Sequence, residues 1–183
     1  MPTLSKEDRI LKLILENSPF KRWHFEELKQ AAGVSRAVAN KWMKKYMQEG
    51  LLKKIKENKR FPYFTAGSNN PVYYARKRIY VLEQLHTCGL FARLLSLEHA
   101  KTIILFGSMA RGDWYKDSDI DLFMYGKADD FDKTVYEQTL GRHIELHIFE
   151  SKEDLQEVRT GLVKNIINGY LIKGQIQDIV EVA

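Results

Sequence analysis

The sequence lacks the features of secreted, fibrous and membrane-spanning proteins. Its 183 residues include one cysteine, Cys88, so no disulfide can form within the chain. Four prolines and eleven glycines are too few for a disordered or collagen-like chain. No run of about 18 apolar residues is present, and the opening residues MPTLSKEDRI have no signal-peptide pattern. We therefore expect a globular protein of a reducing cytoplasm, with no membrane partner.

Charge is present in quantity but is unevenly divided. The formal net charge is +5. Residues 1–90 hold 18 Lys and Arg against 8 Asp and Glu, whereas residues 91–183 hold 11 against 16. A basic half joined to an acidic half indicates two domains with different partners. The basic half is the candidate for nucleic-acid binding.

The basic half shows helical periodicity in three segments, followed by two short strand-like segments. The helices are expected at 6–17, 24–32 and 35–48. Three helices followed by a β-ribbon are the elements of a winged helix, a variant of the helix-turn-helix. The segment GVSRAVANKWMKKYMQEGLLKK resembles the recognition helix and first wing strand of winged-helix regulators. We therefore expect a winged helix-turn-helix DNA-binding domain over residues 1–68.

The third helix and the turn of the ribbon are the parts expected to touch DNA, because basic and amide side chains gather there. The alternative is a dimerisation or docking module with a solvated basic face, which leaves a homodimer open. The residues expected to reach bases or phosphates are Arg36, Asn40, Lys41, Lys44, Lys59 and Arg60.

After the ribbon, a linker of helices is expected over residues 69–98. Asn70 and Pro71 are a strong start signal, an N-cap followed by proline at the first helical position. The remaining residues, 99–183, alternate strand and helix patterns, and the whole chain is assigned to the α+β class. Strands are expected at 101–106, 119–125 and 143–149, and helices at 108–113, 129–139, 152–158 and 160–173.

Residues 107–121, GSMARGDWYKDSDID, carry the clearest chemistry. Gly107 follows the buried strand TIILF, and its missing Cβ lets the backbone approach a ligand closely. Ser108 adds a hydroxyl where helix N–H groups would face an anion. Asp119 and Asp121 share one side of a strand, where they repel each other unless a cation or proton lies between them. Oxygen ligands of this kind suit Mg²⁺.

Gly-Ser, ten residues and Asp-any-Asp together resemble the signature of the DNA polymerase beta nucleotidyltransferase superfamily. The fuller form, GSMARG followed by DSDIDL, is similar to its small members, the minimal nucleotidyltransferases. Those are similar in motif to aminoglycoside nucleotidyltransferases and to the antitoxin halves of some toxin–antitoxin pairs. The resemblance covers about residues 100–173. It implies a mixed β-sheet with helices packed on one face in the domain at 99–183.

The resemblance also implies a reaction. A hydroxyl acceptor would attack the α-phosphorus of a nucleoside triphosphate (NTP), and pyrophosphate would leave. The reaction would use two Mg²⁺ ions, for which Mn²⁺ could substitute. The family has a third carboxylate on a later strand, more often Asp; here the candidate is Glu145, which would also be the general base. The implied metal and catalytic residues are Asp119, Asp121 and Glu145, and the implied nucleotide-binding residues are Gly107, Ser108 and Arg111.

Several alternatives stay open from the residues alone. Glu145 could be an exposed strand residue, although the apolar alternation around it favours the site. Arg111 could form a salt bridge to Asp117 or Asp121 instead of binding phosphate. His143 and His147 share the strand face of Glu145 and are interpreted as bystanders, because Mg²⁺ prefers oxygen.

A different class of function is also consistent with the sequence. The protein could be a DNA-binding transcriptional regulator, or the antitoxin of a toxin–antitoxin pair. Its nucleotidyltransferase domain would then modify or bind a toxin-type partner protein, or be inactive, since a fold does not guarantee an activity.

Overall fold

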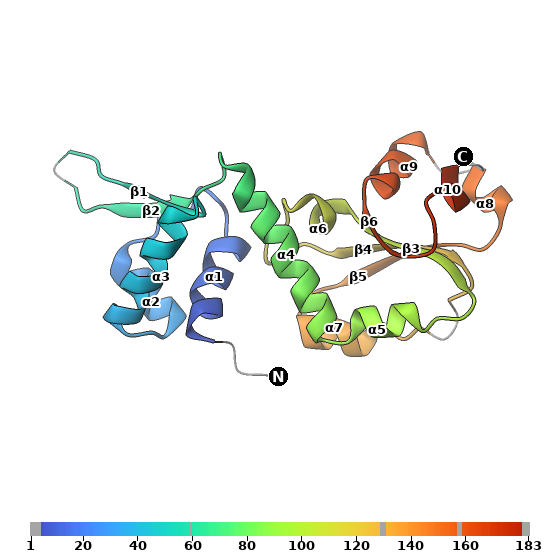
Figure 1. Cartoon of the computed structure of the whole chain (residues 1–183), viewed down its shortest axis with the longest axis horizontal. Helices are drawn as coiled ribbons and strands as arrows, with labels where there is room; N and C mark the ends of the chain where they lie inside the picture. Colours follow the sequence, from blue (N-terminus) through green and yellow to red (C-terminus); the bar gives the residue numbers. More distant parts are fainter. Residues whose placement is uncertain (1–4, 59, 129–130, 157–158, 181–183) are drawn as a thin grey trace. The chain divides into compact units, whose positions relative to one another are not determined.

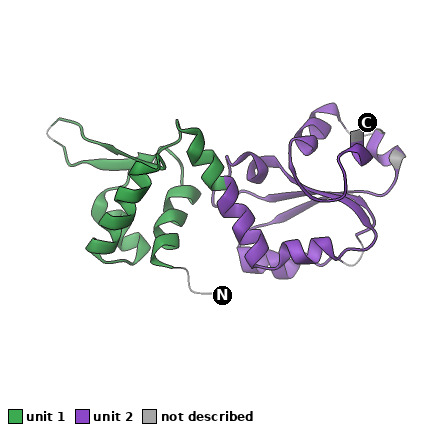
Figure 2. Ribbon diagram, viewed as in Figure 1, with its two compact units in different colours: residues 1–77 green, residues 78–183 purple. Residues whose placement is uncertain are grey.

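The computed structural model describes residues 5–58, 60–128, 131–156 and 159–180. The chain divides into two compact units, Met1–Lys77 and Arg78–Ala183, which Figure 2 shows in different colours. The boundary falls inside helix α4 (Pro71–Thr87), within the segment predicted as a linker. Helix α4 begins as predicted, because the Asn70 side chain accepts the backbone N–H of Val72 at 3.1 Å.

Unit 1 contains three helices followed by a two-stranded antiparallel ribbon, the order that the sequence predicted (Figure 1). The second helix ends at Gly33, which has a left-handed conformation with φ 60°. The buried side chains of the third helix are Ala39, Met43 and Tyr46, so its basic residues face outward. The elements are α1 (Lys6–Glu16), α2 (Phe25–Ala32), α3 (Arg36–Gln48), β1 (Leu52–Ile55) and β2 (Tyr63–Ala66).

Unit 2 is built on a four-stranded mixed sheet in the order β5-β4-β3-β6. Strands β4 and β5 are parallel, and the other pairs are antiparallel. A short helix, α6, joins β3 to β4, and α7 lies between β4 and β5 in the chain. The elements are β3 (Ala100–Phe106), α6 (Gly107–Arg111), β4 (Ile120–Gly126), α7 (Thr134–Leu140), β5 (Ile144–Phe149) and β6 (Tyr170–Lys173).

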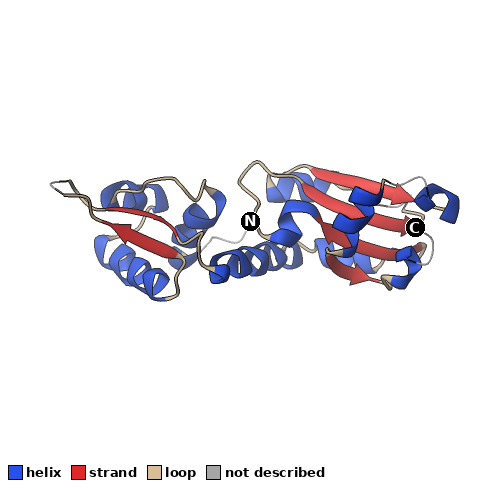
Figure 3. Cartoon of the chain, turned by 90° about the horizontal axis from the view of Figure 1, so that it is seen from above, coloured by secondary structure: helices blue, strands red, loops and turns tan. Residues whose placement is uncertain are grey.

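Helices cover both faces of this sheet, so the expectation of helices on one face is wrong. Phe123 packs on one side against α8 (Lys152–Gln156), α9 (Thr160–Ile167) and α10 (Gln177–Val180). On the other side, Leu122 and Met124 are equally buried. Figure 1 shows α5 (Leu90–Leu95) and α7 on the opposite side of the sheet from α9 and α10, and Figure 3 shows helices lying across the strands. The central strands therefore need cover on both faces, because both sets of alternating side chains are apolar.

Strand β6 corrects the helix expected over 160–173. Helix α9 ends at Ile167, and residues 170–173 form an antiparallel strand beside β3. Gly169 allows this approach, because a Cβ there would lie 2.5 Å from the carbonyl oxygen of Leu105. The helix pattern was locally plausible, but pairing with the edge of the sheet satisfies backbone groups that β3 would otherwise leave open.

Two further expectations meet the limits of the described residues. Residues 129–130, in the helix predicted at 129–139, and residues 157–158, in that predicted at 152–158, lie outside them. In the part of the chain that the structure describes, no helix is both long and apolar enough to cross a membrane.

Candidate active site

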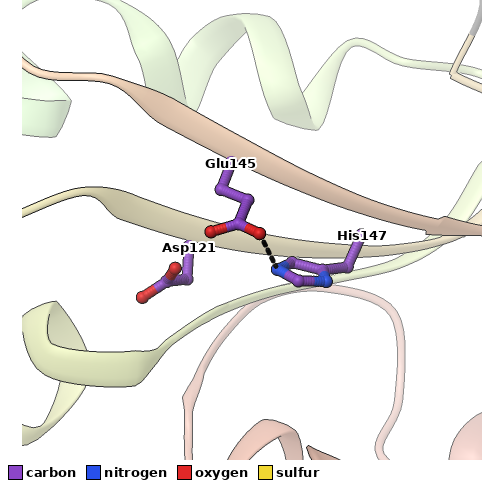
Figure 4. A group of neighbouring side chains, drawn as sticks. All are labelled: Asp121, Glu145 and His147. Atoms are coloured by element: carbon purple, nitrogen blue, oxygen red, sulfur yellow. Dashed lines mark ion pairs between the residues drawn. The ribbon is translucent and has the colours of Figure 1, made fainter.

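Three polar side chains converge where the parallel strands β4 and β5 begin. Asp121 is paired with Glu145 across these strands, and Phe123 is paired with His147. Residues paired in register point to the same face of a sheet, so Asp121, Glu145 and His147 share one face. Each offers one ligand atom, and these atoms all lie within 4.8 Å of one another (Figure 4).

Gly107 makes room for the Asp121 carboxylate. Phe106, the last residue of β3, is paired with Asp121, and the chain turns into α6 immediately afterwards. Gly107 has φ 69°, and a Cβ on it would lie 1.9 Å from Oδ2 of Asp121. The sequence suggested that the missing Cβ admits a ligand. In the structure the missing Cβ admits the side chain of the second aspartate, which ties the two ends of the motif together.

Electrostatics at Asp121 indicate a crowded group of negative charges. Burial raises the pKa of Asp121 above its ordinary value, and the carboxylates of Glu145 and Asp119 raise it further. The nearby His147 and Arg111 lower it. A carboxylate that is partly desolvated and faces two other carboxylates is stabilised by a bound cation. The donor set of this strand face therefore fits a divalent ion held by carboxylate oxygens.

The other predicted residues of unit 2 lie around this group rather than in it. Asp119 is exposed, just before β4 begins. Ser108 is the second residue of α6, and its carbonyl accepts the backbone N–H of Gly112 at 2.8 Å. Arg111 is exposed and forms an ion pair with Asp113 at 3.1 Å. Its partner is thus neither of the two acids considered from the sequence.

The two histidines of β5 differ in their surroundings. His143 turns to Glu137, with its Nδ1 2.8 Å from a carboxylate oxygen. His147 places Nε2 3.5 Å from Oε1 of Glu145, and its ring meets the Phe106 ring edge-on at 5.1 Å between centroids. His147 therefore lies in the group that sequence reasoning reserved for carboxylates. The alternating pattern gave both histidines the same face, and only their contacts, with Glu137 on α7 and with Phe106 on β3, separate them.

The described residues among the predicted DNA contacts are all exposed, but two of them are paired with acidic side chains. Asn40, Lys41 and Lys44 are exposed on α3. By contrast, Arg36 is paired with Glu26, and Arg60 is paired with Glu57 at 3.2 Å. Lys59 lies outside the described residues.

Unit 1 also has a pocket that sequence reasoning missed. Its volume is about 340 Å³, and it brings the ribbon together with the segment before α2. No periodic pattern marks it, since its residues come from two segments that are far apart in the sequence. The lining residues are Arg22, His24, Glu57, Arg60, Phe61 and Tyr63.

Comparison with known proteins gives one family match and two solved structures. The family model described as a nucleotidyltransferase domain matches residues 88–174, a little under half of the chain. One crystal structure, of a mutant of the toxin–antitoxin MntA–HpeT, is 19% identical over 58% of this chain and 80% of that chain, with a TM-score of 0.34. A second, of a toxin–antitoxin with AMP-PNP, is 21% identical over the same shares, also with a TM-score of 0.34. No curated protein matches.

The family match covers the strands that carry the candidate site. Residues 88–174 contain all four strands of the sheet in unit 2, together with α6 and the Gly-Ser and Asp-any-Asp motif. This segment is therefore similar to nucleotidyltransferase domains, and the mixed sheet with its helices is the framework that holds Asp121 and Glu145 side by side.

Proposed function

We propose that unit 2 transfers a nucleoside monophosphate from an NTP to a hydroxyl acceptor. The observation that carries this proposal is the pairing of Asp121 with Glu145 on parallel strands, with Asp119 just before the first of them. Three carboxylates so placed, in a segment that matches the nucleotidyltransferase domain family, support a metal-dependent phosphoryl-transfer site.

The proposed metal-holding residues are Asp119, Asp121 and Glu145, with Mg²⁺ as the ion expected from the sequence. Such ions, when bound, neutralise the charge of the triphosphate and make the attacking hydroxyl more acidic. The chain's own contribution begins with Gly107. Because it lacks a Cβ, Asp121 can stand against the turn between β3 and α6. The Asp121 carboxylate therefore stands beside this turn before any substrate binds.

The remaining roles follow from the order of groups along the turn. Ser108 holds the leaving phosphates through its hydroxyl and neighbouring backbone N–H groups. Arg111 exchanges its contact with Asp113 for a phosphate oxygen. Glu145 takes the proton of the acceptor hydroxyl while the new bond to the α-phosphorus forms and the bond to pyrophosphate breaks. Catalysis then depends mainly on positioning and on stabilising charge.

Label transfer tests this proposal. The protein is incubated with NTPs labelled at the α-phosphate, a divalent ion, and acceptors from three classes: nucleic-acid ends, protein hydroxyls and small hydroxyl compounds. We expect label in an acceptor and release of pyrophosphate. Asp121→Asn should abolish both, because it removes one of the carboxylates proposed to hold the metal. The matched control is Asp117→Asn, which removes an exposed acid four residues earlier. Equal transfer by the two variants would contradict the proposal.

Unit 1 favours a second candidate function, DNA binding by a winged helix. Three helices and a ribbon in the expected order support it, as do Asn40, Lys41 and Lys44, exposed together on α3. In this case the protein is a regulator or an antitoxin, and unit 2 modifies or binds a partner protein. DNA binding without label transfer to any acceptor would favour this candidate over the first.

A salt titration tests the α3 face. Removing two phosphate contacts with Lys41→Ala and Lys44→Ala should weaken DNA binding and lower the slope of log affinity against log salt by about two. A control with Lys6→Ala and Lys12→Ala removes the same charge from α1. If both double variants change the slope equally, net charge rather than the α3 face determines binding.

A further inference from the structure

The position of His147 is not explained by an all-carboxylate site. It lies two residues after Glu145 on β5, and both pairs across β4 and β5 are in register, so its side chain must share the carboxylate face. The imidazole is half-buried, with 23% of the side chain exposed. Its Nε2 faces the Glu145 carboxylate, within the group of possible ligand atoms.

Two contacts fix the orientation of this imidazole. Phe106 packs its ring against the imidazole, and Glu145 faces Nε2 at 3.5 Å (Figure 4). Phe106 is also the residue paired with Asp121 across β3 and β4. Phe106 therefore pairs with Asp121 through its backbone and contacts the His147 ring through its side chain. Locked rotamers of this kind are what a metal-ligating group requires.

We infer that His147 is a metal ligand, and that with Asp121 and Glu145 it forms a centre selective for Mn²⁺ over Mg²⁺. One ligand atom from each of the three lies within 4.8 Å of the others, a spacing that one ion can bridge. Mg²⁺ prefers oxygen ligands and dehydrates reluctantly. An imidazole nitrogen shifts preference from Mg²⁺ toward transition ions, and Mn²⁺ is the transition ion that carboxylate ligands also suit.

This inference deepens the proposed function, because it names the ion of the same site. It also gives His147 a new role, because the family resemblance implied a metal site of carboxylates, completed by Glu145, that did not include His147. The expectation from donor chemistry is that an NTP, if bound, meets a centre in which an imidazole joins the carboxylates, rather than a centre of carboxylates alone.

Pulsed electron paramagnetic resonance of Mn²⁺ tests the ligand directly. A coordinated imidazole gives ¹⁴N modulation of the Mn²⁺ signal, whereas carboxylates and water give none. Tag-free protein is examined with Mn²⁺ alone and with Mn²⁺ plus a methylene-bridged NTP analogue, whose triphosphate carries no nitrogen. We expect ¹⁴N modulation from the native protein in at least one of the two. Its absence from both overturns the inference.

Three variants sharpen the test. His147→Gln should abolish the ¹⁴N modulation and lower Mn²⁺ affinity by at least about tenfold, the smallest loss typical of groups that merely support a metal ligand. His147→Asp should restore binding without ¹⁴N modulation and shift the preference toward Mg²⁺. His143→Gln is the matched control on the same strand, bonded to Glu137 instead, and should keep the signal. Unchanged modulation in His147→Gln would refute the assignment.

The test of the metal ligand is separable from the test of the proposed function, because neither the resonance signal nor the Mn²⁺ affinity requires an acceptor or a turnover. Nitrogen coordination without any label transfer would keep the metal assignment and count against the transferase. Label transfer without nitrogen coordination would keep the transferase and overturn the role of His147.

Discussion

Replacing Gly107 with alanine should displace the Asp121 carboxylate and so weaken metal binding. The new Cβ would lie 1.9 Å from Oδ2 and 2.8 Å from Cγ of Asp121, which is too close for either atom to stay in place. Gly107 also has φ 69°, in the left-handed region that side chains disfavour. The substitution therefore combines backbone strain with a forced rotation of the aspartate.

The two costs can be separated with a second glycine. Gly141 has φ 65°, and a Cβ on it would meet nothing within 4 Å. Gly141→Ala should therefore show the strain alone, about 1–2 kcal/mol of unfolding free energy. Gly107→Ala should lose a further ~0.5–1.5 kcal/mol, the usual cost of turning a side chain away from its rotamer.

Urea unfolding in the presence of a chelator measures these differences, and a Mn²⁺ titration of the folded variants measures the effect on the site. We expect Gly107→Ala to be the less stable variant and to bind Mn²⁺ more weakly, with Gly141→Ala binding as the native protein does. If the two variants unfold with the same free energy and bind equally well, Asp121 does not stand against Gly107, and the reasoning is wrong.

Two other predictions concern the supports of the site. Gly169→Ala should destabilise unit 2 by about 2–4 kcal/mol, because the new Cβ would lie 2.5 Å from the Leu105 carbonyl oxygen. The control is Gly161→Ala, which has open space around it and should leave the free energy of urea unfolding unchanged or raise it. Glu137→Gln should lower stability at neutral pH. The pKa of Glu137 is lowered first by the hydrogen bond from the Ile144 N–H and then by Lys133 and His143. The stability that ionised Glu137 contributes is therefore present above its pKa in the unfolded chain and is lost as pH falls through its pKa in the folded protein. Equal acid-unfolding profiles for native protein and Glu137→Gln would contradict this.

Local patterns predicted most of the elements correctly. Asn70 marks a helix start in the structure as it does in the sequence, and Ser5 and Gly33 also lie at helix ends, because caps and left-handed glycines act within a few residues. Strand β6 and the second covered face of the sheet were missed. Both depend on which segments pack together, and a helical pattern in 160–173 gives no sign of the neighbouring β3.

The candidate site divides in the same way. The sequence shows the spacing of Gly107 and Asp121, but it does not show the reason for that spacing. Only the register of β3 against β4 shows that the glycine accommodates the aspartate itself. Likewise, alternation placed His143 and His147 on one face, and only Glu137 on α7 and Phe106 on β3 give them different surroundings.

The sequence by itself determined the residue types of the chemistry, the helix ends and the division into a basic and an acidic half. These follow from neighbours along the chain and from composition. The tertiary structure alone decided which donors meet, because strand pairing brings Asp121 and Glu145 together across 23 intervening positions and adds His147 to them. Side-chain chemistry is local to the sequence, but a metal-binding geometry requires a sheet register that only the packed fold specifies.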